Sequence, residues 1–224
     1  MPRDTLTRPL IVGAAIELLD VEGLTGLTMR RLGGKLGAVP TAVYWHVGGR
    51  DELIALAADE VWAEVGLPGP AEHGWRPAAT TMATDLYSMI TRHPWLVPAM
   101  SNHLLYGPGK ARHDDHLLAV YEAAGLTSDG ADEASTTVFA FVLGLAVGAT
   151  AETAWRARLR RADDGDQRLA EAMAQVSEIA RQFPRLRSRA APEAAAHHDD
   201  RLTAGLARIL DGIEAESRAS GPRP

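Results

Sequence analysis

The sequence of 224 residues contains no cysteine, which excludes disulfides, thiol chemistry and zinc sites built on thiolate ligands. It also lacks the alternation of apolar and polar residues that predicts β-strands. The longest apolar run, residues 138–149, is shorter than the roughly 18 residues expected of a membrane span. No glycine-rich phosphate loop, nucleophile elbow or specially spaced carboxylate pair is present. These absences favour a helical protein that spans no membrane and is not an enzyme.

The chain does contain apolar residues at helical spacing, separated by glycine and proline. The expected helices span residues 9–22, 28–36, 40–47, 50–65, 76–91, 95–105, 113–124, 131–160, 167–182 and 198–218. The segment 66–74, rich in glycine and proline, predicts a domain junction. We therefore expect an all-α fold with a small domain at residues 1–65, a larger helical domain at residues 66–218 and a disordered tail at residues 219–224.

Residues 27–53 have the pattern of a helix-turn-helix that continues into a connector helix. Thr28 can cap the first short helix, and Gly37 ends it because glycine accepts the left-handed conformation that a tight turn requires. Pro40 suits the first position of a second helix, which closes at Gly48. This second helix has barely two turns, so its neighbours must hold it in place.

The second short helix leaves several side chains available for a partner. Val43 and Val47 lie one turn apart and can face the core. The remaining positions are then on surfaces that can reach a partner: Thr41, Ala42, Tyr44, Trp45 and His46. In the alternative interpretation, Tyr44 or Trp45 packs in the core and His46 is a hydrogen-bonded structural histidine.

The charge of this segment differs from that of the whole chain. The formal net charge is -6, yet residues 23–50 contain no Asp or Glu. The same residues include Arg30, Arg31, Lys35 and Arg50, which predicts a localised basic surface of the kind that binds phosphate groups. The alternative is a solvated helix face that happens to be basic. The turn glycine, the short second helix and its aromatic residues favour nucleic acid.

With these residues the segment 11–65 resembles the DNA-binding domain of the TetR family of transcriptional repressors. In that family a glycine precedes a Thr-x-Arg-x-Leu-x-x-x-Leu-Gly helix, and Tyr-x-His and a basic residue come before an acidic-Leu pair. The matching positions are Gly26, Thr28, Arg30, Leu32, Leu36, Gly37, Tyr44, His46, Arg50 and Leu53. Residues 44–47 are most similar to the tetracycline repressor subgroup, but Pro40 comes one residue early and Ala42 stands where threonine is usual. A different operator sequence is expected.

The resemblance implies a homodimeric repressor of the bacterial cytoplasm that binds a palindromic double-stranded DNA operator and is released by a small, largely apolar effector. It implies no cofactor and no catalysis. The predicted DNA-binding residues are Thr28, Arg30, Thr41, Ala42, Tyr44, Trp45, His46 and Arg50. By analogy with the family, Arg30, Thr41, Ala42 and Trp45 approach the bases, whereas Tyr44, His46 and Arg50 contact the backbone. The alternative is a helical small-molecule-binding protein without DNA-binding activity.

Two later segments indicate a dimer. Residues 131–161 are apolar on nearly every face in their middle, and Gly144 and Gly148 permit close approach of another backbone. The last expected helix has Leu202, Leu206 and Ile213 at helical spacing. Together these segments resemble the two helices that form a four-helix dimer interface in this family, although a monomer with a large buried helix is the alternative. A dimer also suits a palindrome, whose successive major grooves lie roughly 34–36 Å apart.

The effector site and metal binding leave weaker signals. Methionine and aromatic residues are dense between residues 75 and 116, where the family binds its ligands, although such stripes also form ordinary cores. The candidate effector residues are Trp95, His103 and Phe139. Two clusters of histidine and aspartate, residues 113–116 and 197–200, have spacing that can chelate a metal. We expect both to lie at helix starts, where acids stabilise the helix dipole, and predict no metal site.

Overall fold

The computed structural model describes residues 6–160, 164–188 and 198–220, and over these ranges the chain is helical with no strand, which confirms the expected all-α fold. The elements in chain order are α1 (Arg8–Gly26), α2 (Met29–Leu36), α3 (Pro40–Val47), α4 (Arg50–Val61), the 3-10 turn η1 (Trp62–Glu64), α5 (Pro70–His73), α6 (Trp75–Arg92), α7 (Leu96–Met100), α8 (Pro108–Ala123), α9 (Ser128–Arg160), α10 (Gly165–Arg181), α11 (Pro184–Arg187) and α12 (His198–Ser220).

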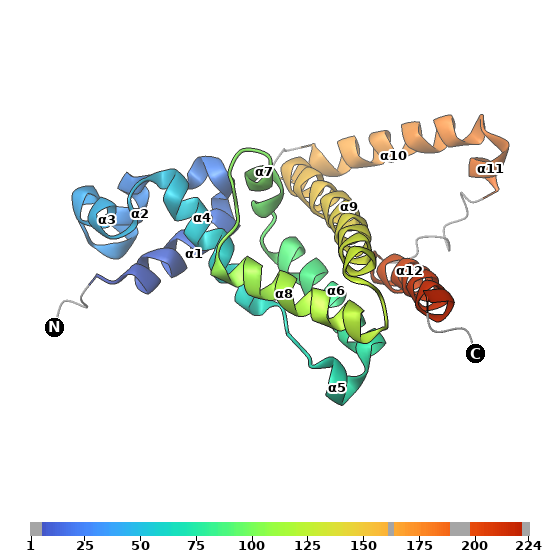
Figure 1. The fold of residues 1–224 in the computed structure, drawn as a ribbon. Helices are drawn as coiled ribbons and strands as arrows, with labels where there is room; N and C mark the ends of the chain where they lie inside the picture. Colours follow the sequence, from blue (N-terminus) through green and yellow to red (C-terminus); the bar gives the residue numbers. More distant parts are fainter. Residues whose placement is uncertain (1–5, 161–163, 189–197, 221–224) are drawn as a thin grey trace.

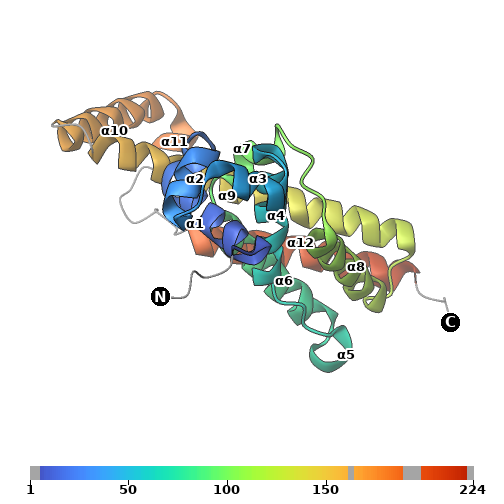
Figure 2. The same cartoon turned by 90° about the vertical axis from the view of Figure 1, so that its left-hand side faces the viewer.

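Helices α1, α2 and α3 form a small unit at one end of the molecule, and α4 leads from it towards the remaining helices (Figures 1 and 2). Pro9 lies in the first turn of α1, and the Thr7 hydroxyl accepts a hydrogen bond from the Leu10 N–H. The core of this unit consists of fully buried side chains, including Ile11, Leu19, Leu32, Val43 and Leu53. Burial of these apolar surfaces holds α2 and α3, which are too short to be stable alone.

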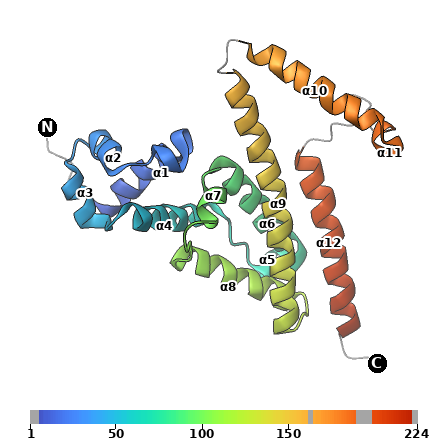
Figure 3. The same cartoon turned by 90° about the horizontal axis from the view of Figure 1, so that it is seen from above.

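The larger part of the chain is built around α9. Helices α6 and α8 pack against the first half of α9, and α12 runs along its other side (Figure 3). Met82, Ile90, Val120 and Val142 contribute to the core between α6, α8 and α9, while Leu206 on α12 closes the far side. Helix α10 extends away from this body (Figure 3). Its apolar stripe, which includes Met173, Val176 and Ile179, is exposed in the single chain.

Several predicted boundaries differ from the structure. The helix expected at residues 113–124 begins at Pro108, because Gly107 and Pro108 form its start instead of breaking it. The helix expected at residues 95–105 is confined to Leu96–Met100. The expected tail is wrong in part, since α12 continues through residues 219 and 220, whereas residues 221–224 lie outside the described part of the chain.

Helix α9 begins three residues before the expected helix at 131–160, and its apolar part extends beyond the apolar run at residues 138–149. The stretch Ser128–Trp155 has the length and composition that would allow a helix to cross a membrane. A single helix of this kind is weak evidence for a membrane span, but only 22% of its most apolar window is buried within the chain. A large apolar surface of α9 therefore remains uncovered in one copy of the protein.

Candidate functional site

The turn between α2 and α3 is fixed by glycine. Gly37 has a φ of 62°, in the left-handed region, and the N–H of Ala38 donates to the Gly33 carbonyl at 2.9 Å. A Cβ atom on Gly33 would lie 2.7 Å from the carbonyl oxygen of Ala38, so the close approach of the turn to α2 requires glycine there. The Thr28 hydroxyl accepts from the Arg31 N–H at 3.2 Å and caps α2 as predicted. The expected helix-turn-helix geometry is confirmed.

Helix α3 presents its polar and aromatic side chains to solvent. Val43 and Val47 are 0% and 2% exposed and face the core, as their spacing predicts. Tyr44 is 48% exposed and Trp45 is 89% exposed, and His46 is exposed as well. None of the three rings packs in the interior, so the alternative interpretation of a core role is wrong. An indole with this exposure is costly in water and suits a surface that meets a partner.

The basic residues of α2 lie next to acidic side chains of α1, so the surface of this segment is less positive than its own sequence predicts. Arg31 forms an ion pair with Glu22, and the Lys35 ammonium lies 2.8 Å from a Glu17 carboxylate oxygen. Both acids come from α1, which packs against α2. Arg30, in contrast, is exposed on α2. Because exposed ion pairs contribute only about 0–1 kcal/mol, Arg31 and Lys35 can exchange these carboxylates for phosphate groups at small cost.

Arg50 has a structural role that the sequence did not reveal. Its Nε donates to the Leu27 carbonyl at 2.9 Å, and its Nη2 donates to the Leu24 carbonyl at 2.5 Å. These bonds tie the first residue of α4 to the end of α1 and the link to α2. Its third nitrogen, Nη1, lies 3.6 Å from a carboxylate oxygen of Asp51. The phosphate contact expected for Arg50 stays a prediction, and two of its five N–H groups already donate to backbone carbonyls.

Asp59 joins α4 to α8 of the larger domain. Its carboxylate accepts from the Gly109 N–H at 3.1 Å and from the Lys110 N–H at 3.0 Å, and thereby caps the start of α8 from α4. A Cβ on Gly107 would lie 2.5 Å from the Asp59 side chain, and one on Gly109 would lie 2.5 Å from the Asp59 carbonyl oxygen. The two glycines around Pro108 are therefore needed for this close helix contact.

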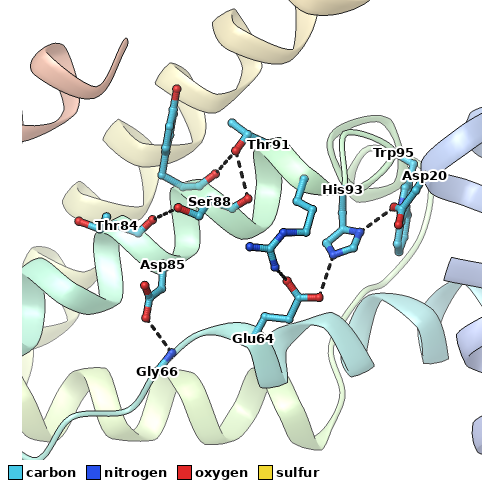
Figure 4. A network of polar contacts seen from close by, with 11 residues as sticks. Asp20, Glu64, Gly66, Thr84, Asp85, Ser88, Thr91, His93 and Trp95 are labelled. Carbon is cyan, nitrogen blue, oxygen red and sulfur yellow. Dashed lines mark hydrogen bonds and ion pairs between the residues drawn. The ribbon is translucent and has the colours of Figure 1, made fainter. Parts of the chain in front are cut away.

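A second polar connection links α1, η1 and the end of α6 (Figure 4). The buried His93 ring lies between two carboxylates, with Nδ1 2.6 Å from Asp20 and Nε2 3.0 Å from Glu64. The Trp95 indole N–H donates to the same Asp20 at 2.8 Å, and Glu64 also pairs with Arg92. This network was not anticipated, because its members are up to 75 residues apart in the sequence and form no local motif.

The larger domain has a cavity of about 380 Å³ between α6, α8 and α9, which is partly open to solvent. Its apolar lining includes Met82, Leu86, Leu117 and Val138, and its polar lining includes Lys110, His113, Asp114, Asp132 and Ser135. The volume is in the range of sites for small organic molecules. The hydroxyl of Ser135 is buried and has no hydrogen-bond partner among the described residues.

Of the three predicted effector residues, the structure places only Phe139 in the lining of this cavity. Trp95 is corrected to a junction residue, because its indole is held by Asp20 of α1. His103 is corrected as well, since its Nδ1 lies 3.9 Å from Asp51 on α4 and it does not line the cavity. The density of aromatic residues in the sequence indicated the region that contains this cavity but could not show which side chains face inwards.

Charged and aromatic groups gather at one end of the cavity. The Lys110 ammonium donates to both carboxylate oxygens of Asp114, at 2.7 and 2.6 Å. His113 is buried against Trp62, with ring centroids 4.7 Å apart, and its Nδ1 is 3.2 Å from Asp114. Burial lowers the pKa of His113 below its usual value of 6.5, against the opposing effect of Asp114. The imidazole is therefore neutral at pH 7.

The two clusters of histidine and aspartate, at residues 113–116 and 197–200, were considered above as possible metal ligands. Within residues 6–160, 164–188 and 198–220, no three His, Cys, Asp or Glu side chains are grouped to hold a metal ion. Residues 113–116 lie inside α8 and not at its start, which corrects the expected placement. The His116 Nε2 lies 2.9 Å from the Pro68 carbonyl oxygen. In the second cluster, His197 lies outside the described residues.

A helix-turn-helix with exposed aromatic residues, joined to a helical domain with a cavity between its helices, defines the class of DNA-binding regulators that respond to small molecules. Residues 67–217 match the family described as tetracyclin repressor-like, C-terminal domain. The chain therefore belongs to the TetR family of transcriptional regulators, whose members are not enzymes.

Individual relatives agree with this assignment. An HTH-type transcriptional regulator of Saccharopolyspora erythraea is 35% identical over 151 residues, which cover 67% of this chain and 63% of the relative, so the match spans less than two thirds of that protein. The HTH-type transcriptional repressor DrrR1 of Streptomyces coeruleorubidus is 29% identical over 214 residues, covering 95% of this chain and 79% of the relative. The structure of ActR from Streptomyces coelicolor in complex with actinorhodin has 28% identity and a TM-score of 0.74, with 97% and 99% of the two chains covered.

Proposed function

We propose that the protein is a homodimeric repressor of the bacterial cytoplasm that binds a palindromic DNA operator and is released by a small, largely apolar effector. Residues 1–65 would read the DNA, and residues 66–218 would bind the effector and form the dimer. The observation that carries the proposal is the surface of α3, where Trp45 is 89% exposed beside Tyr44 and His46 while Val43 and Val47 anchor the helix.

The DNA contacts divide into two groups. Arg30, Thr41, Ala42 and Trp45 approach base edges, where a guanidinium can donate two hydrogen bonds to guanine and apolar surface can meet a thymine methyl group. Tyr44 and His46 contact the phosphate backbone through ring O–H and N–H groups. Thr28 and Arg50 belong to the same surface but also fix its shape, because Thr28 caps α2 and Arg50 holds α4 against α1.

The dimer is supported by helices α9 and α12, which lie side by side (Figure 3). Both helices have small exposed residues, which are Ala140, Gly144, Gly148 and Ala151 on α9 and Ala204, Gly212 and Ala215 on α12. A Cβ at Gly144, Gly148 or Gly212 would meet nothing within 4 Å in the single chain. A second copy packed there would cover the apolar surface of α9 and complete a four-helix interface.

Release requires that the cavity and the DNA-reading unit respond to each other. Residues of α8 line the cavity, and Asp59 of α4 caps the first turn of the same helix. An effector that fits better when α8 is displaced therefore biases the position of α4 and of the reading unit, and shifts the population away from the DNA-binding state. The structure of ActR with actinorhodin shows that a protein with this fold holds a small organic ligand.

The deciding experiment is a mobility-shift titration of the full chain with the DNA that flanks its own gene. We expect sequence-specific binding that Trp45→Ala weakens by roughly 5- to 150-fold, as loss of a contact worth about 1–3 kcal/mol would do. Val176→Ala is the matched control, because Val176 is an exposed apolar residue on α10, away from α3. Absence of any specific shift, or equal binding of the two variants, would contradict the proposal and favour a helical small-molecule-binding protein.

A further inference from the structure

The ammonium group of Lys110 lies among three aromatic rings. Its Nζ is 5.0 Å from the ring centroid of Trp62, 5.6 Å from that of Tyr106 and 5.5 Å from that of Phe139. The rings come from η1, from the segment between α7 and α8, and from α9. Aromatic faces attract cations at distances up to about 6 Å, so three parts of the fold together form a site for a positive charge. We call these three residues the aromatic cage.

The charges around the cavity also favour a cation. Lys110 is the one ammonium in the lining, which also contains the carboxylates of Asp114 and Asp132. His113 adds no charge, because burial keeps it neutral. Two of the three N–H groups of Lys110 already donate to Asp114. An anionic ligand would therefore meet an excess of negative charge and a lysine that is already neutralised.

Most of the remaining lining is apolar, and it includes Met82 and Leu86 of α6, Leu117 of α8 and Val138 of α9. Asp132, Ser135 and Thr136 of α9 are the polar residues of that part. A ligand that fills about 380 Å³ must therefore bury mainly apolar surface and place any charged group at the end where Lys110 lies. The lining favours a molecule with a mainly apolar body and a charged group at one end.

We propose that the aromatic cage is a cation subsite, which Lys110 fills in the free protein, and that the effector is an apolar molecule with an organic ammonium group that takes the place of Lys110. This inference rests on the proposed function, because it names the chemical class of the effector. The backbone N–H of Lys110 is bonded to Asp59 of α4. Displacing the Lys110 side chain therefore acts on the residue through which α8 meets the DNA-reading unit.

The test compares three probes of similar shape: phenyltrimethylammonium, its neutral isostere tert-butylbenzene, and benzoate. Their dissociation constants are measured by ligand-detected NMR on the full-length wild type and two variants, Lys110→Ala and Tyr106→Leu. Tyr106 is 61% exposed, and Lys110→Ala retains the backbone bond to Asp59, so both variants should fold. Thermal unfolding curves verify this before binding is measured.

We expect Lys110→Ala to bind phenyltrimethylammonium on the order of tenfold more tightly than the wild type, because the cage is vacated and Asp114 loses its partner. Tyr106→Leu should bind it several-fold more weakly, because one ring is lost. The affinity for tert-butylbenzene should be the same in all three proteins. Unchanged cation affinity in both variants, or benzoate binding that Lys110→Ala abolishes, would overturn the proposal, the latter by showing that Lys110 receives an anion.

The mobility-shift titration of the same proteins separates the two proposals. Cation binding with the expected pattern, in a protein that binds no specific DNA, would overturn the regulatory function and leave the cation subsite intact. Specific DNA binding together with an unchanged cation affinity in both variants would overturn the subsite alone.

Discussion

Replacing Arg50 with alanine tests whether this residue holds the DNA-reading unit together or contacts the DNA. The substitution removes the hydrogen bonds to the carbonyls of Leu27 and Leu24, at 2.9 and 2.5 Å. Hydrogen bonds from a charged donor contribute roughly 1.5–3 kcal/mol each when buried. The Arg50 side chain is 38% exposed, so solvent screening reduces this by about half. The expected loss in the free energy of unfolding is about 1.5–3 kcal/mol.

The loss is measurable by differential scanning calorimetry of the full chain. For a chain of this size, 1 kcal/mol shifts the Tm by about 2–4 °C, so Arg50→Ala should lower the Tm by roughly 3–12 °C. Arg30→Ala is the matched control, because Arg30 is exposed on the neighbouring α2. Its Tm should equal that of the wild type, while the salt dependence or sequence preference of DNA binding should weaken.

The salt dependence of operator binding supplies the refuting result. If Arg50 mainly contacts phosphate, as the resemblance to the TetR family implies, Arg50→Ala should leave the Tm unchanged and make the salt slope shallower by about one unit. That outcome would show that the two carbonyl contacts contribute little to stability and that the positioning role inferred here is wrong.

Three further substitutions test other parts of the structure. The folded-state pKa of His113 lies below 6.5, so the unfolded chain takes up this proton first and the free energy of unfolding should fall as the pH decreases below about 6.5. His113→Gln should flatten that part of a pH series of urea unfolding curves, and an unchanged series would rule out this cause. Asp59→Ala removes the cap of α8 and should lower the free energy of unfolding by about 0.5–2 kcal/mol, as measured with urea, whereas an equal stability would show that the cap is dispensable. Gly148→Leu adds a side chain where the single chain has open space, so sedimentation should show folded monomer in place of dimer. A stable Gly148→Leu dimer, or a wild-type monomer at micromolar concentration, would contradict the proposed interface.

The helix-turn-helix could be predicted in detail because its determinants are close together in the sequence. A threonine three residues before the N–H that it caps, a glycine at a left-handed turn and a proline at the start of a helix act on backbone groups nearby. The alternation of buried and exposed side chains on α3 follows from helical spacing alone, and both Val43 and Val47 are buried as expected.

The surroundings of these residues were less predictable. The basic segment contains no acid in the sequence, yet α1 brings Glu17 and Glu22 to its surface. Trp95 and His103 were expected in the effector cavity, but both face the junction with the DNA-reading unit. Aromatic composition shows that a region is apolar, whereas the direction of each side chain depends on how the helices cross.

The sequence by itself determined the helices, the turn and the aromatic surface of α3, because caps, breakers and helical spacing act over a few residues. Only the tertiary structure decided that Asp59 caps α8, that His93 lies between Asp20 and Glu64, and that three rings surround Lys110. Each of these arrangements joins residues tens of positions apart, and only the packing of apolar helix faces brings them within hydrogen-bonding or ring-contact distance.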